Sequence, residues 1–258
     1  MDRSTCSSLV ILVAMVSQTG IGQSIAADAP TIKTFDSNGT KISYSVQGKG
    51  KPVVLIHGWL SSSQINWAFP GTSALLARDY QVIALDVRGH GQSDKPTTEE
   101  AYGLELIADV LRLLDHLKID KAHIVGYSMG GLIAAKFIAK HPDRVLTGTL
   151  GGMGWSQDGG AAQWAFGRIG KNESNANALT LCGRSLSKLS LTESELKSIK
   201  APMTVLVGEN DRLIHRLYIE PLKQARPDWP IIEIKDGNHL NCIMKPQFQE
   251  ELAGSLKK

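Results

Sequence analysis

The sequence predicts an α/β domain built on a mainly parallel β-sheet. Three observations predict it. Short, continuously apolar runs are typical of strands that are buried on both faces, and segments with helical periodicity lie between them. The chain has 258 residues, of which 42% are hydrophobic, so it can bury a substantial core as one large domain or two small ones.

A hairpin comes first in this reading, followed by the buried strands. Alternating runs near residues 32–35 and 41–46 flank Asn38 and Gly39, a turn signal that predicts an antiparallel hairpin. Continuous apolar runs then predict buried strands at residues 53–56, 82–85, 124–125, 145–150, 204–207 and 231–234.

Helix-period segments separate these strands. Residues 104–117 place their apolar side chains on one face of a 3.6-residue helix, and residues 132–139 form a second such segment. Thr192 and Glu195 have the spacing of a capping box and predict a short helix. This alternation of strand and helix indicates a parallel sheet covered by helices.

One interval breaks the alternation. Residues 151–190 are rich in Gly, Ala, Asn and Ser, and they lie between two expected strands. A loop of this length is uncommon in a compact domain unless it is functional. We therefore expect a small lid of loops and short helices, with a plain surface excursion as the alternative.

The first residues have the pattern of an export signal peptide. Arg3 precedes an apolar run at residues 9–16, and small residues offer a cleavage site after Ala26. The run is far shorter than the roughly 20 residues of a membrane-spanning helix. We expect residues 1–26 to be removed on export to the periplasm or the medium, which leaves no stable membrane span. An uncleaved anchor and a plain cytosolic leader are the alternatives.

Charge and cysteine content exclude several classes of protein. The chain has 28 Lys and Arg against 25 Asp and Glu, a formal charge of only +3, and no basic block, so nucleic-acid binding is not its expected role. Three cysteines are too few for a disulfide scaffold and lack metal-site spacing. Cys182 and Cys242 can pair or stay as separate buried thiols. Without a ligand cluster or a phosphate-cradling loop, no metal or organic cofactor is expected.

The strongest chemical signal is Gly126-Tyr127-Ser128-Met129-Gly130, which lies where an expected strand gives way to a helix. The serine of such a turn has a strained backbone, and side chains two residues to either side would collide with neighbouring backbone, which explains the glycines. The turn raises the Ser128 hydroxyl above the sheet, next to a helix N-terminus that favours negative charge. Ser128 is therefore the expected nucleophile.

A serine hydroxyl needs an adjacent base that is held by a third group. His239 lies in a loop after the last expected strand, which can deliver its imidazole to the same edge of the sheet as Ser128. The acid is expected between serine and histidine in chain order, and Asp211 directly follows an expected strand. Glu209 is the competing acid, and Asp158 is a weaker candidate.

Two backbone N–H groups are expected to form an oxyanion hole. One belongs to Met129, and the other belongs to Trp59, in a loop where Gly58 permits an unusual backbone angle. His57 is expected to shape this loop through hydrogen bonds. Ordinary core packing is the alternative for pocket residues outside the serine turn. The side chains expected to line an apolar substrate pocket are Trp59, Tyr127, Met153 and Trp155.

These residues together resemble the serine-dependent α/β-hydrolase family, including its cofactor-free bacterial haloperoxidases. His57-Gly58, residues 86–94, the serine turn, Asp211 and His239 follow the family order. The resemblance implies the α/β-hydrolase fold over residues 27–258: an eight-stranded, mostly parallel sheet flanked by helices, with an antiparallel second strand and a small cap after strand six. It also implies a structural role for residues 86–94. The cap is a departure, because similar members usually carry a larger helical insertion.

The resemblance and the residues together predict a serine hydrolase that acts on carboxylic esters of small to medium acyl substrates through an acyl-enzyme intermediate. Lactone hydrolysis, aminopeptidase action, carbon–carbon bond hydrolysis, perhydrolysis and non-catalytic ligand sensing remain alternatives. Dehalogenases and epoxide hydrolases of this family normally use an aspartate nucleophile, so a serine at position 128 argues against both. The expected partner is a small-molecule ester, and the oligomeric state is left open.

Overall fold

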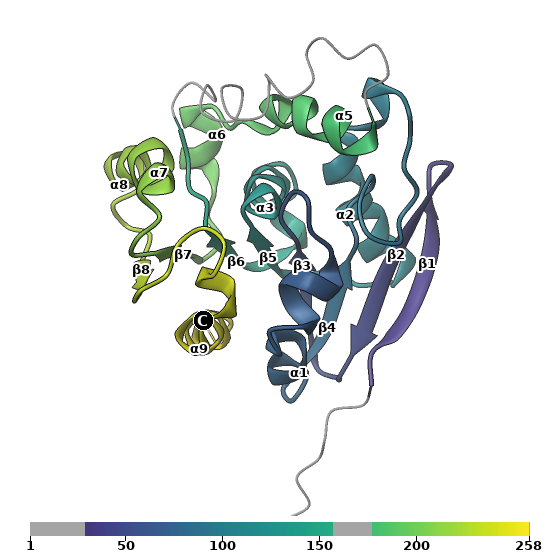
Figure 1. Ribbon diagram of the computed structural model, residues 1–258, viewed down its shortest axis with the longest axis horizontal. Coiled ribbons are helices and arrows are strands. Elements are labelled where there is room, and N and C mark those ends of the chain that lie inside the picture. Colours follow the sequence, from purple (N-terminus) through teal and green to yellow (C-terminus); the bar gives the residue numbers. More distant parts are fainter. Residues whose placement is uncertain (1–28, 157–176, 258) are drawn as a thin grey trace, which may run out of the picture.

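A computed structural model describes residues 29–156 and 177–257 of the chain. The expected signal peptide at residues 1–26 lies outside the described residues. Residues 157–176 of the expected lid, which include Asp158, also lie outside them. Eight strands of the described part form one sheet in the order β1-β2-β4-β3-β5-β6-β7-β8 (Figure 1). This order and its mostly parallel pairing agree with the sheet that the resemblance implied.

The predicted hairpin forms the first edge of the sheet. β1 (Thr31–Ser37) pairs antiparallel with β2 (Thr40–Gln47). Between them Asn38 and Gly39 both have positive φ, at 56° and 78°, as a two-residue turn matched to the twist of its strands requires.

The six strands predicted from apolar runs are all confirmed, most of them longer at their ends. β2 pairs antiparallel with β4, and every other neighbouring pair from β4 to β8 is parallel. The strands are β3 (Lys51–Ile56), β4 (Tyr80–Leu85), β5 (Ala122–Tyr127), β6 (Val145–Gly151), β7 (Met203–Gly208) and β8 (Ile231–Ile234).

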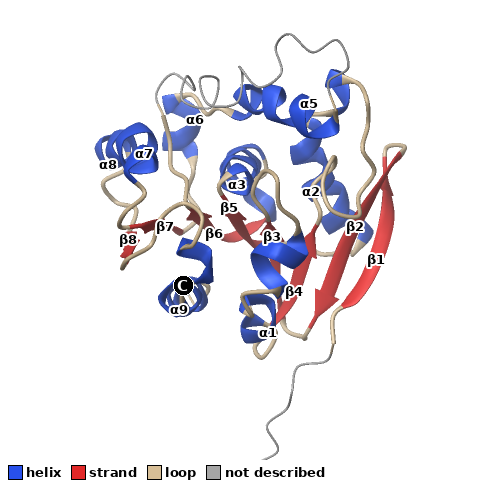
Figure 2. Ribbon diagram, in the orientation of Figure 1, coloured by secondary structure: helices blue, strands red, loops and turns tan. Residues whose placement is uncertain are grey.

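Helices cover both faces of the sheet (Figure 2). The two helix-period segments and the capping-box helix are confirmed as α2, α3 and α6. One face packs against α2 (Glu105–His116), α3 (Met129–Lys140), α6 (Glu193–Ser198) and α8 (Glu220–Ala225), and the other against α1 (Thr72–Leu76) and α9 (Pro246–Ser255). The other helical segments are η1 (Gln64–Ala68), η2 (Glu99–Ala101), η3 (Pro142–Arg144), α5 (Ala178–Ser185), η4 (Leu186–Leu189), α7 (Arg212–Ile214), η5 (His215–Ile219) and η6 (Cys242–Met244).

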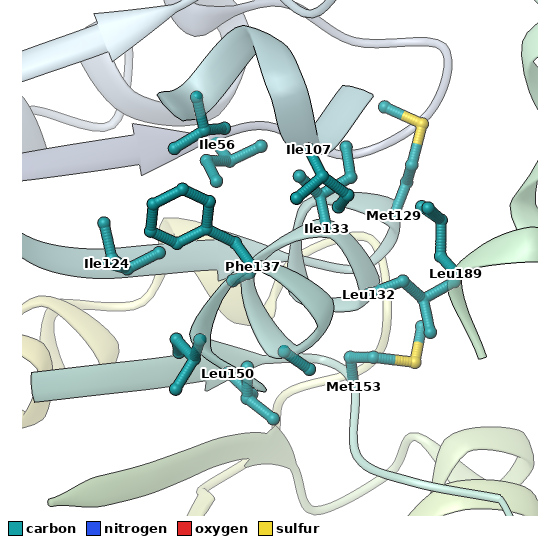
Figure 3. Packing of buried hydrophobic residues seen from close by; sticks show 14 of the residues in the cluster. Ile56, Ile107, Ile124, Met129, Leu132, Ile133, Phe137, Leu150, Met153 and Leu189 are labelled. Carbon is teal, nitrogen blue, oxygen red and sulfur yellow. The ribbon is translucent and has the colours of Figure 1, made fainter. Parts of the chain in front are cut away.

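The core fixes α3 against the centre of the sheet. Figure 3 shows Ile133 and Phe137 of this helix pointing toward Ile56 of β3 and Ile124 of β5, and all four side chains are fully buried. Because α3 starts at the residue after Ser128, this packing also fixes where the serine turn lies.

The described end of the expected lid packs onto the loops at one edge of the sheet. In α5, the Cys182 thiol lies 3.8 Å from the Met129 sulfur. The indole N–H of Trp59 donates to the carbonyl oxygen of Leu179 at 3.0 Å. Cys182 and Cys242 are both buried free thiols in different hydrophobic clusters, so they do not pair.

A buried ion pair ties the loop after β4 to α2. The Arg88 guanidinium binds both carboxylate oxygens of Asp109, each at 2.6 Å, and donates to the carbonyl oxygen of Ala101. Asp109 also accepts a 2.6 Å hydrogen bond from the Ser37 hydroxyl at the end of β1. Because these bonds join three segments, residues 86–94 have a structural role here, as the resemblance implied.

Removing the buried carboxylate is expected to destabilise the fold. Asp109→Ala leaves the Arg88 charge buried without its partner, which should lower the free energy of unfolding by about 3–5 kcal/mol. Asp115→Ala is the matched control on the same helix, because Asp115 is exposed and its pair with Arg144 is worth about 1 kcal/mol or less. Chemical denaturation of both variants measures the difference, and equal losses would contradict the interpretation.

Candidate active site

The structure brings together the three residues predicted as nucleophile, base and acid. The Ser128 Oγ lies 2.9 Å from His239 Nε2, and His239 Nδ1 lies 2.7 Å from Asp211 Oδ2. Each residue follows the carboxyl end of a parallel strand, β5, β7 or β8, so sheet topology places all three at one edge. The arrangement has the order of contacts that activates a serine hydroxyl.

The backbone turn at Ser128 depends on its glycines. Ser128 has φ 53° and ψ −116°, a strained conformation for a residue with a side chain. A Cβ on Gly126 would lie 1.9 Å from the Gly130 carbonyl oxygen, and one on Gly130 would lie 2.1 Å from the Ile56 carbonyl oxygen. Glycine alone fits these positions, as the sequence analysis predicted.

Asp211 is held at the start of a short helix. Its Oδ1 accepts from the Ile214 backbone N–H at 3.4 Å, and its buried carboxylate keeps Oδ2 toward His239. Glu209, the competing acid, instead accepts a hydrogen bond from the Asp236 backbone N–H at 3.0 Å. Asp211 is therefore the carboxylate that contacts the histidine.

Tyr127 supports the histidine rather than presenting its hydroxyl to the pocket. It is buried, and its hydroxyl donates to the His239 carbonyl oxygen at 2.7 Å. Its ring also packs against the imidazole and against Phe248 of α9. Burial raises the pKa of the Tyr127 hydroxyl, so it stays a neutral donor. Tyr127 also lines the cavity beside Ser128, as predicted.

The loop after β3 is held differently from our prediction. Gly58 does not have a positive φ; the residue of this loop that does is Leu60, at 59°. A Cβ on Gly58 would lie 3.4 Å from the Ser128 Cβ, which is an ordinary van der Waals distance, so space alone does not require glycine here. The Gly58 backbone N–H donates to Asn66 Oδ1 at 2.8 Å, which fixes the His57–Gly58 peptide, one peptide before the one that carries the Trp59 N–H.

Asn66 was missed by the sequence analysis. It lies in η1, a π-helical segment. Such segments are rare in proteins overall, but those that occur are often at functional sites. Nothing in the surrounding Ser-Ser-Ser-Gln-Ile-Asn-Trp marks this asparagine, because its role arises from contact with a loop eight residues earlier.

His57 shapes the same loop, as predicted. The Val87 backbone N–H donates to His57 Nε2 at 3.0 Å, so the ring proton is on Nδ1 and is donated to the Gly58 carbonyl oxygen at 2.7 Å. Complete burial lowers the pKa of His57 and keeps it neutral. Met129, the other expected oxyanion residue, begins α3, so its backbone N–H precedes the helix's own hydrogen bonds.

A cavity of about 580 Å³ opens beside Ser128. Of the predicted pocket residues, Trp59, Tyr127 and Met153 line it, but Trp155 does not. Trp155 is buried elsewhere, where its indole N–H donates to the Leu191 carbonyl oxygen at 2.9 Å. Most of the lining is apolar. It also includes Leu60, Ile65, Asn66, Leu213, Ile214, Leu217, Tyr218, Leu240 and Ile243.

Two further properties concern the described part of the chain alone. Residues 29–156 and 177–257 contain no group of three or more His, Cys, Asp or Glu side chains that could hold a metal ion. Within the same ranges, no helix combines the length and the apolar character needed to cross a bilayer.

In sequence, the chain is similar to a known family. A model of the alpha/beta hydrolase fold matches residues 51–190, more than half of the chain. An uncharacterised protein of Mycobacterium tuberculosis is 36% identical over 128 residues. That match covers 48% of this chain and 36% of that protein, so the similarity spans little more than a third of the relative's length.

In structure, the chain is similar to solved proteins over most of its length. A carboxylesterase structure from the thaumarchaeon Nitrososphaera gargenis superposes with a TM-score of 0.70 at 21% identity, covering 88% of this chain and 97% of that one. A bromoperoxidase from Bacillus anthracis gives a TM-score of 0.69 at 22% identity, covering 88% and 100%. At these identities the likeness concerns the fold.

Relief of the turn at Ser128 is expected to stabilise the protein. Ser128→Gly and Ser128→Ala both remove the hydroxyl, but only glycine also removes the Cβ that makes a positive φ costly. We expect the glycine variant to have a free energy of unfolding about 1 kcal/mol or more above that of the alanine variant. Denaturant titration compares the two, and an alanine variant of equal or greater stability would show that the turn is unstrained.

Proposed function

Because this chain belongs to the alpha/beta hydrolase family, we propose that it is a serine hydrolase of carboxylic esters with small to medium acyl groups. The observation that carries the proposal is the unbroken path of hydrogen bonds from Ser128 through His239 to the buried Asp211, beside an apolar cavity. A cavity of about 580 Å³ is within the usual size range of small-molecule sites.

In the proposed first step, the Ser128 Oγ attacks the ester carbonyl carbon while its proton passes to His239 Nε2. The carbonyl oxygen becomes an oxyanion that accepts hydrogen bonds from the backbone N–H groups of Met129 and Trp59. The dipole of α3, which begins at Met129, favours the same negative charge.

In the second step, the tetrahedral intermediate collapses. The bond from carbon to the alkoxy oxygen breaks, His239 returns its proton to the leaving alcohol, and the acyl group stays on Ser128. Water then attacks the acyl-enzyme as His239 takes a proton from it. The bond from the acyl carbon to Ser128 Oγ then breaks, His239 returns its proton to Oγ, and the carboxylic acid is released.

Asp211 serves both half-reactions without exchanging a proton. Its buried Oδ2 accepts the Nδ1 proton of His239, which leaves Nε2 as the base toward Ser128. The carboxylate also stabilises the imidazolium that forms after proton transfer. Burial strengthens this interaction, because little water screens the two groups.

The triad assignment predicts large and nearly equal losses of activity. Ser128→Ala and His239→Ala should each lower kcat by about 10⁴–10⁶, because the residues act as a unit. Asp211→Asn should lower kcat by about 10⁴ through the wrong imidazole tautomer. Turnover of p-nitrophenyl butanoate measures these changes, with labelling by a fluorophosphonate as a second readout for Ser128.

Glu209→Gln is the control for the acid, because its carboxylate binds the Asp236 backbone instead of the imidazole. More than a tenth of wild-type turnover in Ser128→Ala or His239→Ala would refute the assignment. A wild-type protein that is stabilised by esters but never turns them over would indicate a ligand sensor instead.

The anchor of the oxyanion loop gives a further prediction. Asn66→Ala removes the acceptor that holds the Gly58 N–H, so the Trp59 N–H should shift from its place. We expect kcat to fall by about tenfold to a hundredfold, the cost of a small misplacement, with KM nearly unchanged. Steady-state kinetics on the same ester tests this. Gln64→Ala is the matched control, because Gln64 is a neighbouring exposed residue of the same segment. Equal losses of kcat in both variants would contradict a positioning role for Asn66.

A further inference from the structure

We infer that the cavity beside Ser128 continues onto an apolar rim that binds the outer part of an unbranched acyl chain, so that octanoyl and decanoyl esters are better substrates than acetates. We define the rim as Leu60, Ile65, Leu213 and Leu240. The inference rests on the proposed function, because it places the ester carbonyl at Ser128. It narrows the substrate to the longer end of the proposed range.

The rim concentrates much of the exposed apolar surface of the described residues. Eight large hydrophobic side chains in those ranges are exposed, and four of them line this one cavity. Their exposed fractions are 61% for Leu60, 55% for Ile65, 45% for Leu213 and 86% for Leu240. Apolar side chains that gather at one opening mark a binding surface, whereas single exposed ones scattered over a protein need no explanation.

The rim is built from separate parts of the chain that meet only at this edge. Leu60 and Ile65 belong to the segment after β3, Leu213 belongs to α7, and Leu240 follows His239. Local sequence therefore does not account for the clustering. These side chains share the lining of one cavity with Ser128 and the buried Met153, so the same cavity joins the serine to exposed apolar side chains.

The position of the rim at the opening of the cavity favours a long acyl chain over a short one. An acetyl group would leave the rim in contact with water, whereas a longer chain that starts at the Ser128 carbonyl must leave the cavity across it. Each methylene that is removed from water on the rim can raise kcat/KM by up to about fourfold. The increase in kcat/KM with chain length should therefore continue to acyl chains that would be too long for a closed site shaped for an acetyl group.

The test is a chain-length series of p-nitrophenyl esters from acetate to decanoate, each kept below its solubility limit. The quantity compared is the ratio of kcat/KM for decanoate to that for acetate, which cancels any change in the triad itself. We expect this ratio to be well above one in the wild type. It should fall at least about tenfold in the double variant Leu213→Ser/Leu240→Ser.

Two further variants control the experiment. Ile65→Ser changes the opposite segment of the rim and should lower the ratio as well, so the result does not depend on one variant. Leu104→Ser is the matched control, because Leu104 is 47% exposed, as Leu213 nearly is, but lies outside the cavity lining. It should leave the ratio unchanged.

The possible results separate this inference from the proposed function. One result would overturn the inference and leave the proposed function standing. In it, acetate hydrolysis depends on Ser128, but the ratio of kcat/KM for decanoate to that for acetate is below one or is unchanged in the rim variants. In a second series taken above the solubility limits, a rise in rate that appears only there also overturns the inference and indicates docking to a lipid surface. Absence of Ser128-dependent turnover on every ester overturns the proposed function itself.

Discussion

The backbone contact between the serine turn and β3 is the constraint around which this site is arranged. Gly130 lies against the Ile56 carbonyl oxygen so closely that any side chain would overlap it, and the Ser128 N–H donates to the Gly151 carbonyl oxygen of β6. The turn is thus held from both neighbouring strands. A conformation that costs about 1–3 kcal/mol persists because the packing of α3 on the sheet leaves no alternative.

The same turn also positions the proposed base. Tyr127 and Ser128 are consecutive, yet the serine hydroxyl meets the imidazole of His239 while the tyrosine hydroxyl holds the backbone of that histidine. Phe248 packs against the Tyr127 ring, and it belongs to α9, which lies on the face of the sheet opposite to α3. The distance between nucleophile and base therefore depends on core packing as well as on the loop after β8.

The sequence predicted the features that a local pattern encodes. Apolar runs gave the buried strands, and the glycine spacing around Ser128 placed the turn that topology then brings to Asp211 and His239. It did not predict α9, whose buried side chains are few. The prediction that Trp155 lines the pocket was wrong. An aromatic side chain after a strand can pack into the core or line a pocket, and only the surrounding tertiary contacts decide between the two.

Burial also separates the histidines that composition cannot distinguish. His57 lies in the loop after β3 and His90 in the loop after β4, and burial lowers the pKa of both rings, to about 4 for His90. A ring that stays neutral can orient backbone groups but cannot take a proton near neutral pH. The His239 side chain is 35% exposed, and its Nδ1 lies 2.7 Å from the Asp211 carboxylate. Of these three imidazoles, His239 is the one whose ring contacts the Ser128 hydroxyl, which is why it is the proposed base.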